Sequence, residues 1–167
     1  MIDKNSLLDP EEAIGFVSYR TSLSIKQYIL KQFKEHGFDT TAEQFGVMIR
    51  IFKHDGLSQN QLAEKVFKQG PNITRIIDDL EEKGLVVRKL DASDRRKYLL
   101  FLSEEGINCI GSLLEIARET YLSFSKDISE EDMLTTLNVL NRIYHNINPE
   151  EELYVLNSFK NAFWRQN

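Results

Sequence analysis

Two adjacent arginines, Arg95 and Arg96, are the residues whose type and spacing point most directly to a chemistry. They lie in a polar turn between two short apolar runs, residues 85–90 and 97–102, which are typical of the paired strands of a hairpin. At a hairpin tip the backbone bonds are already made in the ladder, so both guanidinium groups would project into solvent. Guanidinium groups bind phosphate and enter nucleic-acid grooves. Asp94, the preceding residue, is expected to orient one of them.

The segment before this hairpin predicts two helices. Ser58 and Gln61 have the spacing of a capping box, which predicts a helix over residues 58–67. After a turn at residues 68–70, Pro71 suits the first position of a second helix, and Gly84 suits its end. Apolar residues recur at helical spacing along one side of this second helix, namely Ile73, Ile76, Ile77 and Leu80.

The opposite face of the second helix is polar and suggests what these elements do together. Helix, short turn, second helix and arginine-tipped hairpin is the order of a winged helix-turn-helix, whose second helix contacts the major groove through its N-terminal residues. We therefore expect Asn72, Thr74 and Arg75 to reach base edges or phosphates. Ser58 and Gln59 would offer polar groups to the DNA backbone.

The hairpin tip is expected to enter the minor groove through Arg95 or Arg96. Which of the two does so stays open, because one could instead be held by a carboxylate such as Asp78 or Asp94.

The stretch that carries these features resembles the MarR family of bacterial transcriptional regulators. The resemblance rests on residues 62–63 through Thr74-Arg75, on residues 80–86, and on residues 94–96 through Leu102-Ser103 to Gly106. It covers about 45 contiguous residues and is specific, because helix pair, glycine stop and wing motif occur together at the right spacing. The threonine that usually precedes the last of these helices is Ser103 here, which caps a helix equally well.

The resemblance implies a fold and an organisation. The fold is mainly α with a small β-hairpin wing, a winged helix-turn-helix core plus N- and C-terminal dimerisation helices. Residues 1–167 would form a single domain, with a DNA-binding lobe over about 41–103 and a helical dimerisation lobe over 9–37 and 103–167. The function implied is a homodimeric, double-stranded DNA-binding repressor that binds an inverted repeat and is released by a small effector. No enzymatic activity is expected.

The distribution of charge favours DNA binding although the whole chain has a net charge of -5. Residues 58–103 contain 9 basic and 7 acidic residues, a net charge of +2, whereas residues 104–167 contain 5 and 11, a net charge of -6. Within residues 83–97, six basic residues face only Asp91 and Asp94. Phosphate contacts depend on local charge, so the predicted wing is a cationic spot on an acidic body.

The remaining segments are predicted to be helical. A cap and first-turn proline at Asp9-Pro10 begin a helix that Gly37 ends, and residues 41–53 form another. Residues 103–124 and 129–147 carry apolar residues at alternating steps of three and four, as in a coiled-coil seam. Two such seams exceed what a small core needs, so we assign part of them to a subunit interface; the alternative is packing within one chain. Residues 149–167 suggest a further amphipathic helix, which would either lengthen the dimer arm or cap the core.

Other chemistries lack a signature. The chain contains no G-x-x-x-x-G-K, G-x-G-x-x-G or H-E-x-x-H motif, and its three histidines lie far apart, so neither a cofactor nor a metal is expected. Cys109, on an apolar helical stripe, is expected to be a core thiol. No apolar stretch reaches membrane-spanning length without charge, which predicts a cytoplasmic protein without membrane contact. The alternatives left open are a winged helix used for protein interaction and a metal-responsive regulator of the same family.

An effector pocket is expected between the DNA-binding lobe and the dimerisation helices, a location that the resemblance supplies. Arg20 is the candidate partner for a carboxylate, and an aromatic or apolar acid would suit the mixed lining. The same residues could simply close the core, with Arg20 solvated. The expected lining is Phe16, Tyr19, Arg20 and Leu23 on the first helix and Phe45 and Ile49 on the second.

Overall fold

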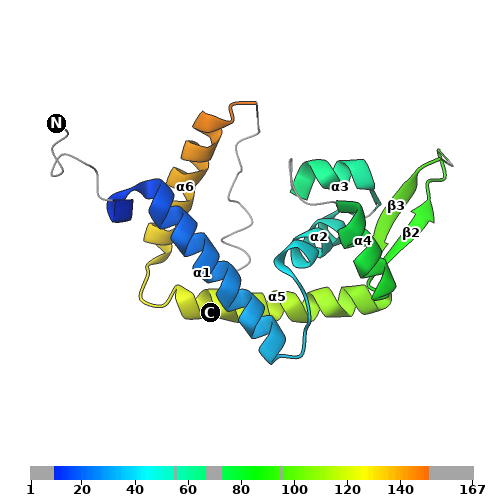
Figure 1. Ribbon diagram of the computed structural model, residues 1–167, viewed down its shortest axis with the longest axis horizontal. Coiled ribbons are helices and arrows are strands. Elements are labelled where there is room, and N and C mark those ends of the chain that lie inside the picture. The colour runs from blue at the N-terminus through cyan, green and yellow to red at the C-terminus, as the bar shows by residue number, and fades with distance from the viewer. Residues whose placement is uncertain (1–9, 55, 67–72, 95, 151–167) are drawn as a thin grey trace. The chain divides into compact units, whose positions relative to one another are not determined.

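The structure is a computed structural model, and it describes residues 10–54, 56–66, 73–94 and 96–150. It divides into two compact units, Met1–Ala117 and Arg118–Asn167. The described residues are mostly helical with one small antiparallel sheet, which confirms the predicted fold class (Figure 1). The expected helix over 149–167 falls almost wholly outside the described residues.

Among its described residues, the first unit contains helices α1 to α4, the sheet and the start of α5. A 3-10 turn, Pro10–Glu12, precedes helix α1, Ile14–Glu35. The rest of the unit follows in the order α2 (Ala42–Lys53), β1 (Leu57–Ser58), α3 (Gln59–Val66), α4 (Ile73–Glu82), β2 (Val86–Leu90), β3 (Tyr98–Leu102) and the first part of α5 (Glu104–Phe124). The second unit holds the end of α5 and α6, Glu130–Ile147.

The first helix begins later than its sequence predicts. Pro10, at the expected start, lies in the 3-10 turn, and α1 begins only at Ile14; Asp9 lies outside the described residues. Glu11 and Glu12 also lie in that 3-10 turn. Ala13 stands at the N-cap and makes no side-chain capping bond, so this helix start lacks the polar cap found at α2, α3, α5 and α6.

Side-chain caps begin four of the described helices, α2, α3, α5 and α6. Ser58 and Gln61 form the predicted capping box at α3, with Ser58 Oγ accepting from the Gln61 N–H at 3.3 Å and Gln61 Oε1 accepting from the Ser58 N–H at 2.9 Å. Thr41 and Gln44 form a second box at α2. Ser129 Oγ accepts from the Asp132 N–H at 3.0 Å and caps α6. These bonds satisfy backbone donors that a helix start otherwise leaves open.

The sheet has three strands in the order β1-β3-β2, all antiparallel. Its larger part is the predicted hairpin, in which Val86 pairs with Leu102 and Leu90 with Tyr98. The sequence did not predict β1, which contributes two residues and pairs Leu57 with Leu100. A two-residue strand gives no alternating pattern for sequence analysis to detect.

The core of the first unit joins the helices to the base of the hairpin. It is built from side chains that are almost completely buried, with residues from α1, α2, α3, α4, the sheet and α5. The three apolar residues that α4 contributes, Ile76, Ile77 and Leu80, are among those that its spacing predicts. The most buried members are Phe33, Val47, Met48, Ile51, Leu62, Ile77, Leu80, Val86, Leu100, Ile110 and Leu113.

The start of α5 is packed closely against the turn that follows α4. Gly84 ends α4 with φ +71, a left-handed conformation that favours glycine. Ser103 Oγ donates to the Gly84 carbonyl oxygen at 2.6 Å and accepts from the Gly106 N–H at 2.9 Å. A Cβ on Gly106 would stand 2.0 Å from the carbonyl oxygen of Leu85. The chain therefore passes from β3 into α5 through a junction that has no space for a Cβ at Gly106.

The second unit leaves much of its apolar surface exposed. None of the residues of α6 is buried, and Val139, Tyr144 and Ile147 are all exposed. Near the end of α5, the rings of Tyr121 and Phe124 meet edge to face with centroids 5.1 Å apart. Among the described helices, none is long and apolar enough to cross a membrane.

Candidate nucleic-acid interface

The first turn of α4 presents Thr74 and Arg75 to solvent. Both side chains are exposed, while Ile76 and Ile77 on the other side of the helix are buried in the core. This division follows from the helical spacing of the apolar residues, which fixes the rotation of α4 about its axis. Asn72 and the expected helix start at Pro71 lie outside the described residues.

The start of α3 lies against this turn. Gln59, the first residue of α3, donates from Nε2 to Thr74 Oγ1 at 2.6 Å. The structure thus brings together two of the residues predicted to contact DNA. Ser58 is half-buried, and its hydroxyl already caps α3, as the sequence predicts.

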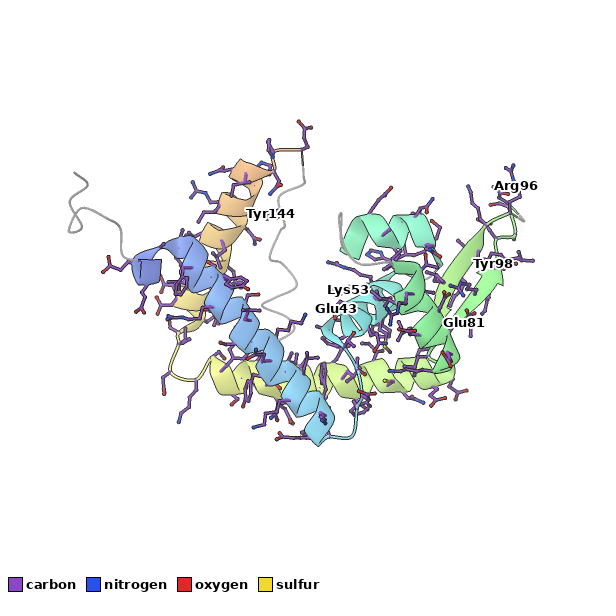
Figure 2. All side chains as sticks on the ribbon, viewed as in Figure 1. Glu43, Lys53, Glu81, Arg96, Tyr98 and Tyr144 are labelled. Atoms are coloured by element: carbon purple, nitrogen blue, oxygen red, sulfur yellow. The ribbon has the colours of Figure 1, made fainter. Side chains whose placement is uncertain are left out.

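The hairpin tip holds Arg96 in the open. The Arg96 side chain is 90% exposed, and its Nε donates to Asp94 Oδ1 at 3.1 Å. Figure 2 shows Arg96 at the far end of the hairpin, away from the helices of its unit. Arg95 lies outside the described residues. The expectation that Asp94 orients an arginine is confirmed for Arg96.

Two aspartates organise the backbone of the tip. Asp94 Oδ1 also accepts from the Arg96 N–H at 3.1 Å, and its Oδ2 lies 3.5 Å from Lys97 Nζ. Asp91 Oδ1 accepts from the Ser93 N–H and hydroxyl, both at 2.7 Å. The Arg96 hydrogen bonds lower the pKa of Asp94 below its ordinary value of 3.8, and those from Ser93 lower the pKa of Asp91. Both carboxylates are thereby held in their charged form.

The cationic spot is smaller than its sequence predicts. Lys83 Nζ donates to the Asp39 carbonyl oxygen at 2.9 Å, so this lysine is tied to the loop between α1 and α2. Arg88 is engaged with Asp78 and Glu81 of α4. The hydrogen bond to Asp78 raises the pKa of Arg88 above its ordinary value. Sequence analysis missed this pairing, because it depends on how β2 lies beside α4.

The remaining cations lie along the hairpin. Lys89 Nζ stands over the Phe101 ring, 4.9 Å from its centroid, and Lys97 is largely exposed. With Arg96 they form the wing cations, defined as Lys89, Arg96 and Lys97 among the described residues. Their charge is available to a polyanion approaching the hairpin.

The predicted effector residues lie in two different environments. Phe16, Tyr19 and Leu23 of α1 are exposed, with Arg20 over the Phe16 ring at 5.8 Å. Phe45 and Ile49 of α2 are partly buried against the core of the first unit. The Phe45 ring meets Phe33 edge to face, with centroids 5.0 Å apart.

Metal binding and thiol chemistry would depend on the histidine, acidic and cysteine side chains of the chain. No group of three or more histidine, cysteine or acidic residues there could hold a metal ion. Cys109 is half-buried against the core. Burial raises the pKa of its thiol above the ordinary 9.0, and the Glu105 carboxylate adds to this shift while Lys83 opposes it.

Comparison with known proteins agrees with this architecture. Residues 40–98 match the model of the MarR family. A protein of Thauera aromatica, described as a candidate transcriptional regulatory protein for the hcr operon, is 30% identical over 100 residues, which is 60% of this chain and 60% of that protein. This chain therefore matches less than two thirds of the length of that relative.

The fold is shared by many solved structures, of which two are compared with this chain. The transcriptional repressor CouR, bound to a 23-mer DNA duplex, is 24% identical with a TM-score of 0.73, covering 83% of this chain and 99% of that chain. BpsR of Bordetella bronchiseptica, studied for the regulation of its DNA binding by 6-hydroxynicotinic acid, is 16% identical with a TM-score of 0.74, covering 83% and 98%.

The helix pair, the exposed first turn of α4 and the arginine-tipped hairpin define a winged helix-turn-helix protein. The family model spans these same elements from α2 to the start of β3. Over these residues, 40–98, the chain is similar to the MarR family.

Proposed function

We propose that the protein is a homodimeric, sequence-specific regulator of transcription that binds double-stranded DNA, acts as a repressor and is released by a small effector. The MarR family consists of transcriptional regulators rather than enzymes, and the fold of this chain is shared with a repressor bound to DNA. Such a regulator acts in the cytoplasm, where the chromosome is accessible.

One observation carries the DNA-binding part of the proposal. The exposed first turn of α4 and the exposed Arg96 tip of the hairpin belong to the same unit and are joined through one core. A helix of this kind fits the major groove, and a hairpin tip beside it fits the adjoining minor groove. Thr74 and Arg75 would then contact base edges or phosphates, as would Asn72. Gln59 would support Thr74, and Arg95 or Arg96 would enter the minor groove.

DNA binding is tested by fluorescence anisotropy with duplexes from the region flanking the gene for this protein. The proposal expects nanomolar binding to one duplex and much weaker binding to a shuffled duplex of equal composition, in salt of about 0.15 M. Equal affinity for both would leave only non-specific DNA binding. No binding to any duplex would favour the alternative, a winged helix used for protein interaction.

The homodimer is supported by apolar side chains that the single chain leaves exposed on three helices. Helix α6 buries none of its residues, which is unusual for an amphipathic helix of a stable protein. A second copy of the chain would cover such faces symmetrically. Exposed members are Ile14, Phe16 and Tyr19 on α1, Leu114 and Leu122 on α5, and Val139, Tyr144 and Ile147 on α6.

The effector is proposed to be an aromatic acid that binds at the six predicted residues on α1 and α2. Arg20 would donate hydrogen bonds to the carboxylate, and Phe16 beside it would contact the ring of the ligand. The DNA binding of BpsR is regulated by 6-hydroxynicotinic acid, an aromatic acid, which supports this class of ligand. An effector that lowers DNA affinity must itself bind more weakly to the DNA complex, by the same factor.

This reciprocity is measured by titration calorimetry with salicylate, in the presence and absence of the bound duplex. Weaker salicylate binding to the complex would support the effector site, and equal affinity in both titrations would exclude control by this compound. Arg20→Ala should weaken salicylate binding and leave the affinity for DNA alone unchanged. If Arg20→Ala binds salicylate normally, Arg20 is not part of the site.

A further inference from the structure

Arg88 connects the hairpin to the exposed side of α4. It lies in β2 opposite Leu100, and its side chain is only 24% exposed although it carries a charge. Its Nη2 donates to Asp78 Oδ1 at 2.5 Å, and its Nη1 donates to Glu81 Oε2. Glu81 is labelled in Figure 2 on the part of α4 that lies beside the base of the hairpin. One guanidinium group thus bridges two carboxylates.

The two carboxylates belong to the helix that carries the predicted base contacts. Asp78 follows Thr74 and Arg75 by four and three positions, which places it one turn further along the same face. Its side chain is 55% exposed and that of Glu81 is 40% exposed. Without a partner, two negative charges at this place would repel the phosphates that α4 must approach.

The shape of the arginine side chain suits this task. A planar guanidinium group can donate to two acceptors at once in a fixed geometry, whereas a lysine ammonium group cannot hold the same planar arrangement. Because the donor is on β2 and both acceptors are on α4, the bridge also fixes the base of the hairpin against the helix.

We propose that Arg88 is a positioning residue for DNA binding, which neutralises Asp78 and Glu81 and holds the hairpin at α4, without itself contacting a phosphate. This inference rests on the proposed DNA-binding function. It separates Arg88 from the wing cations, which have the same charge and lie on the same hairpin but would act on DNA directly.

A double-mutant cycle distinguishes these two roles. Arg88→Met is made in the parent protein and in an Asp78→Asn, Glu81→Gln background, and operator affinity is measured on folded protein well below its thermal midpoint. In the parent, Arg88→Met should weaken binding about tenfold. In the neutral background it should change binding less than about twofold, because the charges that it compensates are gone. A loss of equal size in both backgrounds would show that Arg88 acts on DNA independently and would overturn the proposal.

Lys89→Met is the matched control, because it removes the same charge from the next residue of β2. Lys89 contacts the Phe101 ring rather than a carboxylate. Its effect on DNA affinity should be the same in both backgrounds. If Lys89→Met is rescued by the neutral background as well, general charge on the hairpin explains the result and the specific role of Arg88 is refuted.

Thermal unfolding without DNA tests the bridge itself. Arg88→Met should lower the thermal midpoint by about 2 to 8 °C in the parent and by clearly less in the neutral background. Additive shifts would refute the bridge even if DNA binding were normal. Conversely, a protein that shows the coupling in its stability but binds no duplex would refute the proposed function and the role of Arg88 in it, while the bridge would stand.

Discussion

Gly106 shows how a single hydrogen atom can decide the packing of two elements. It lies in the first turn of α5, where a Cβ would stand 2.0 Å from the carbonyl oxygen of Leu85 and 2.9 Å from the carbonyl carbon. Backbone atoms cannot rotate away as a side chain can, so any substitution must move α5 or the turn after Gly84. Glycine is needed here for space, whereas at Gly84 it is needed for φ.

Gly106→Ala is expected to destabilise the protein by at least about 2 kcal/mol, because it overpacks this junction. Gly111→Ala is the matched control on the same helix, since Gly111 is exposed and a Cβ there meets nothing within 4 Å. That substitution should stabilise the protein by about 0.5 to 1 kcal/mol through helix propensity. Urea unfolding of both variants measures the difference. Equal stabilities would show that α5 can shift to accommodate a methyl group.

The Cys109 thiol is expected to be unreactive. Burial and Glu105 raise the pKa of its thiol, so the reactive thiolate is scarce at neutral pH. Cys109→Ser should retain DNA binding and its regulation, and the parent thiol should react slowly with a disulfide reagent. Loss of DNA binding on mild peroxide treatment, if prevented by Cys109→Ser, would contradict this and identify a redox switch.

At the level of elements, a charged pair links α1 to α2. Lys26 Nζ of α1 lies 2.8 Å from Glu43 Oε1, and the Glu43 side chain is 32% exposed. Glu43 lies in the first turn of α2 (Figure 2). The Lys26 hydrogen bond is the largest cause of a pKa for Glu43 below its ordinary value of 4.5, and the backbone bond adds to it. An acid at a helix N-terminus also interacts favourably with the helix dipole.

The stability due to Glu43 should therefore depend on pH. The pKa of Glu43 is lower in the folded state. Its contribution to the free energy of unfolding is therefore fully present above about pH 4.5 and is lost as pH falls through the folded-state pKa. Glu43→Gln should lower stability at pH 7 by less than about 1 kcal/mol, since the pair is partly exposed. The difference in thermal midpoint between the parent and this variant should disappear in acid. A difference that persists at low pH would have to come from packing rather than charge.

Helix α4 and the hairpin tip should differ in what they contribute to DNA binding. Arg96→Ala is expected to weaken binding to all sequences and to reduce the slope of log affinity against log salt by about 1, as for one lost phosphate contact. Arg75→Ala, if Arg75 pairs with a guanine, should cost about 1 to 3 kcal/mol mainly at one base position. Binding profiles of both variants over a randomised operator library compare these effects. Identical profiles would reject this division of roles.

The elements that sequence analysis predicted well are those fixed by local chemistry. The Ser58–Gln61 box, the stop at Gly84 and the two strands of the hairpin each depend on residues close together in the chain. The Arg88 bridge depends on where β2 lies beside α4, and β1 is a strand only because β3 is there to pair with it. Such features follow from the tertiary fold, so local patterns do not reveal them.

For the whole molecule, the exposed apolar residues predict association. The protein should be a dimer at micromolar concentration by light scattering, and it should bind an inverted repeat whose half-site centres lie about 10 to 10.5 bp apart. Ile147 of α6 is 72% exposed, so a charge there should disturb an interface without disturbing the fold of one chain.

Ile147→Asp is expected to weaken the dimer about tenfold or more, since it would bury a charge at the interface. Asn138→Asp adds the same charge to an exposed polar position of α6 and should leave the dimer intact. A monomeric parent protein would contradict the proposed dimer. Equal effects of both substitutions would mean that net charge, rather than the apolar face, controls association.

The pairing of β1 with β3 has a consequence for the order of folding. The hairpin of β2 and β3 closes locally, but Leu57 reaches Leu100 only across a loop of roughly forty residues that contains α3, α4 and β2. The loop-closure entropy of this contact must be overcome before its pairing is gained, so β1 should join the sheet late in folding. Substitutions at Leu57 should then speed unfolding more than they slow folding. Substitutions of core residues in the hairpin, which forms earlier, should instead slow folding.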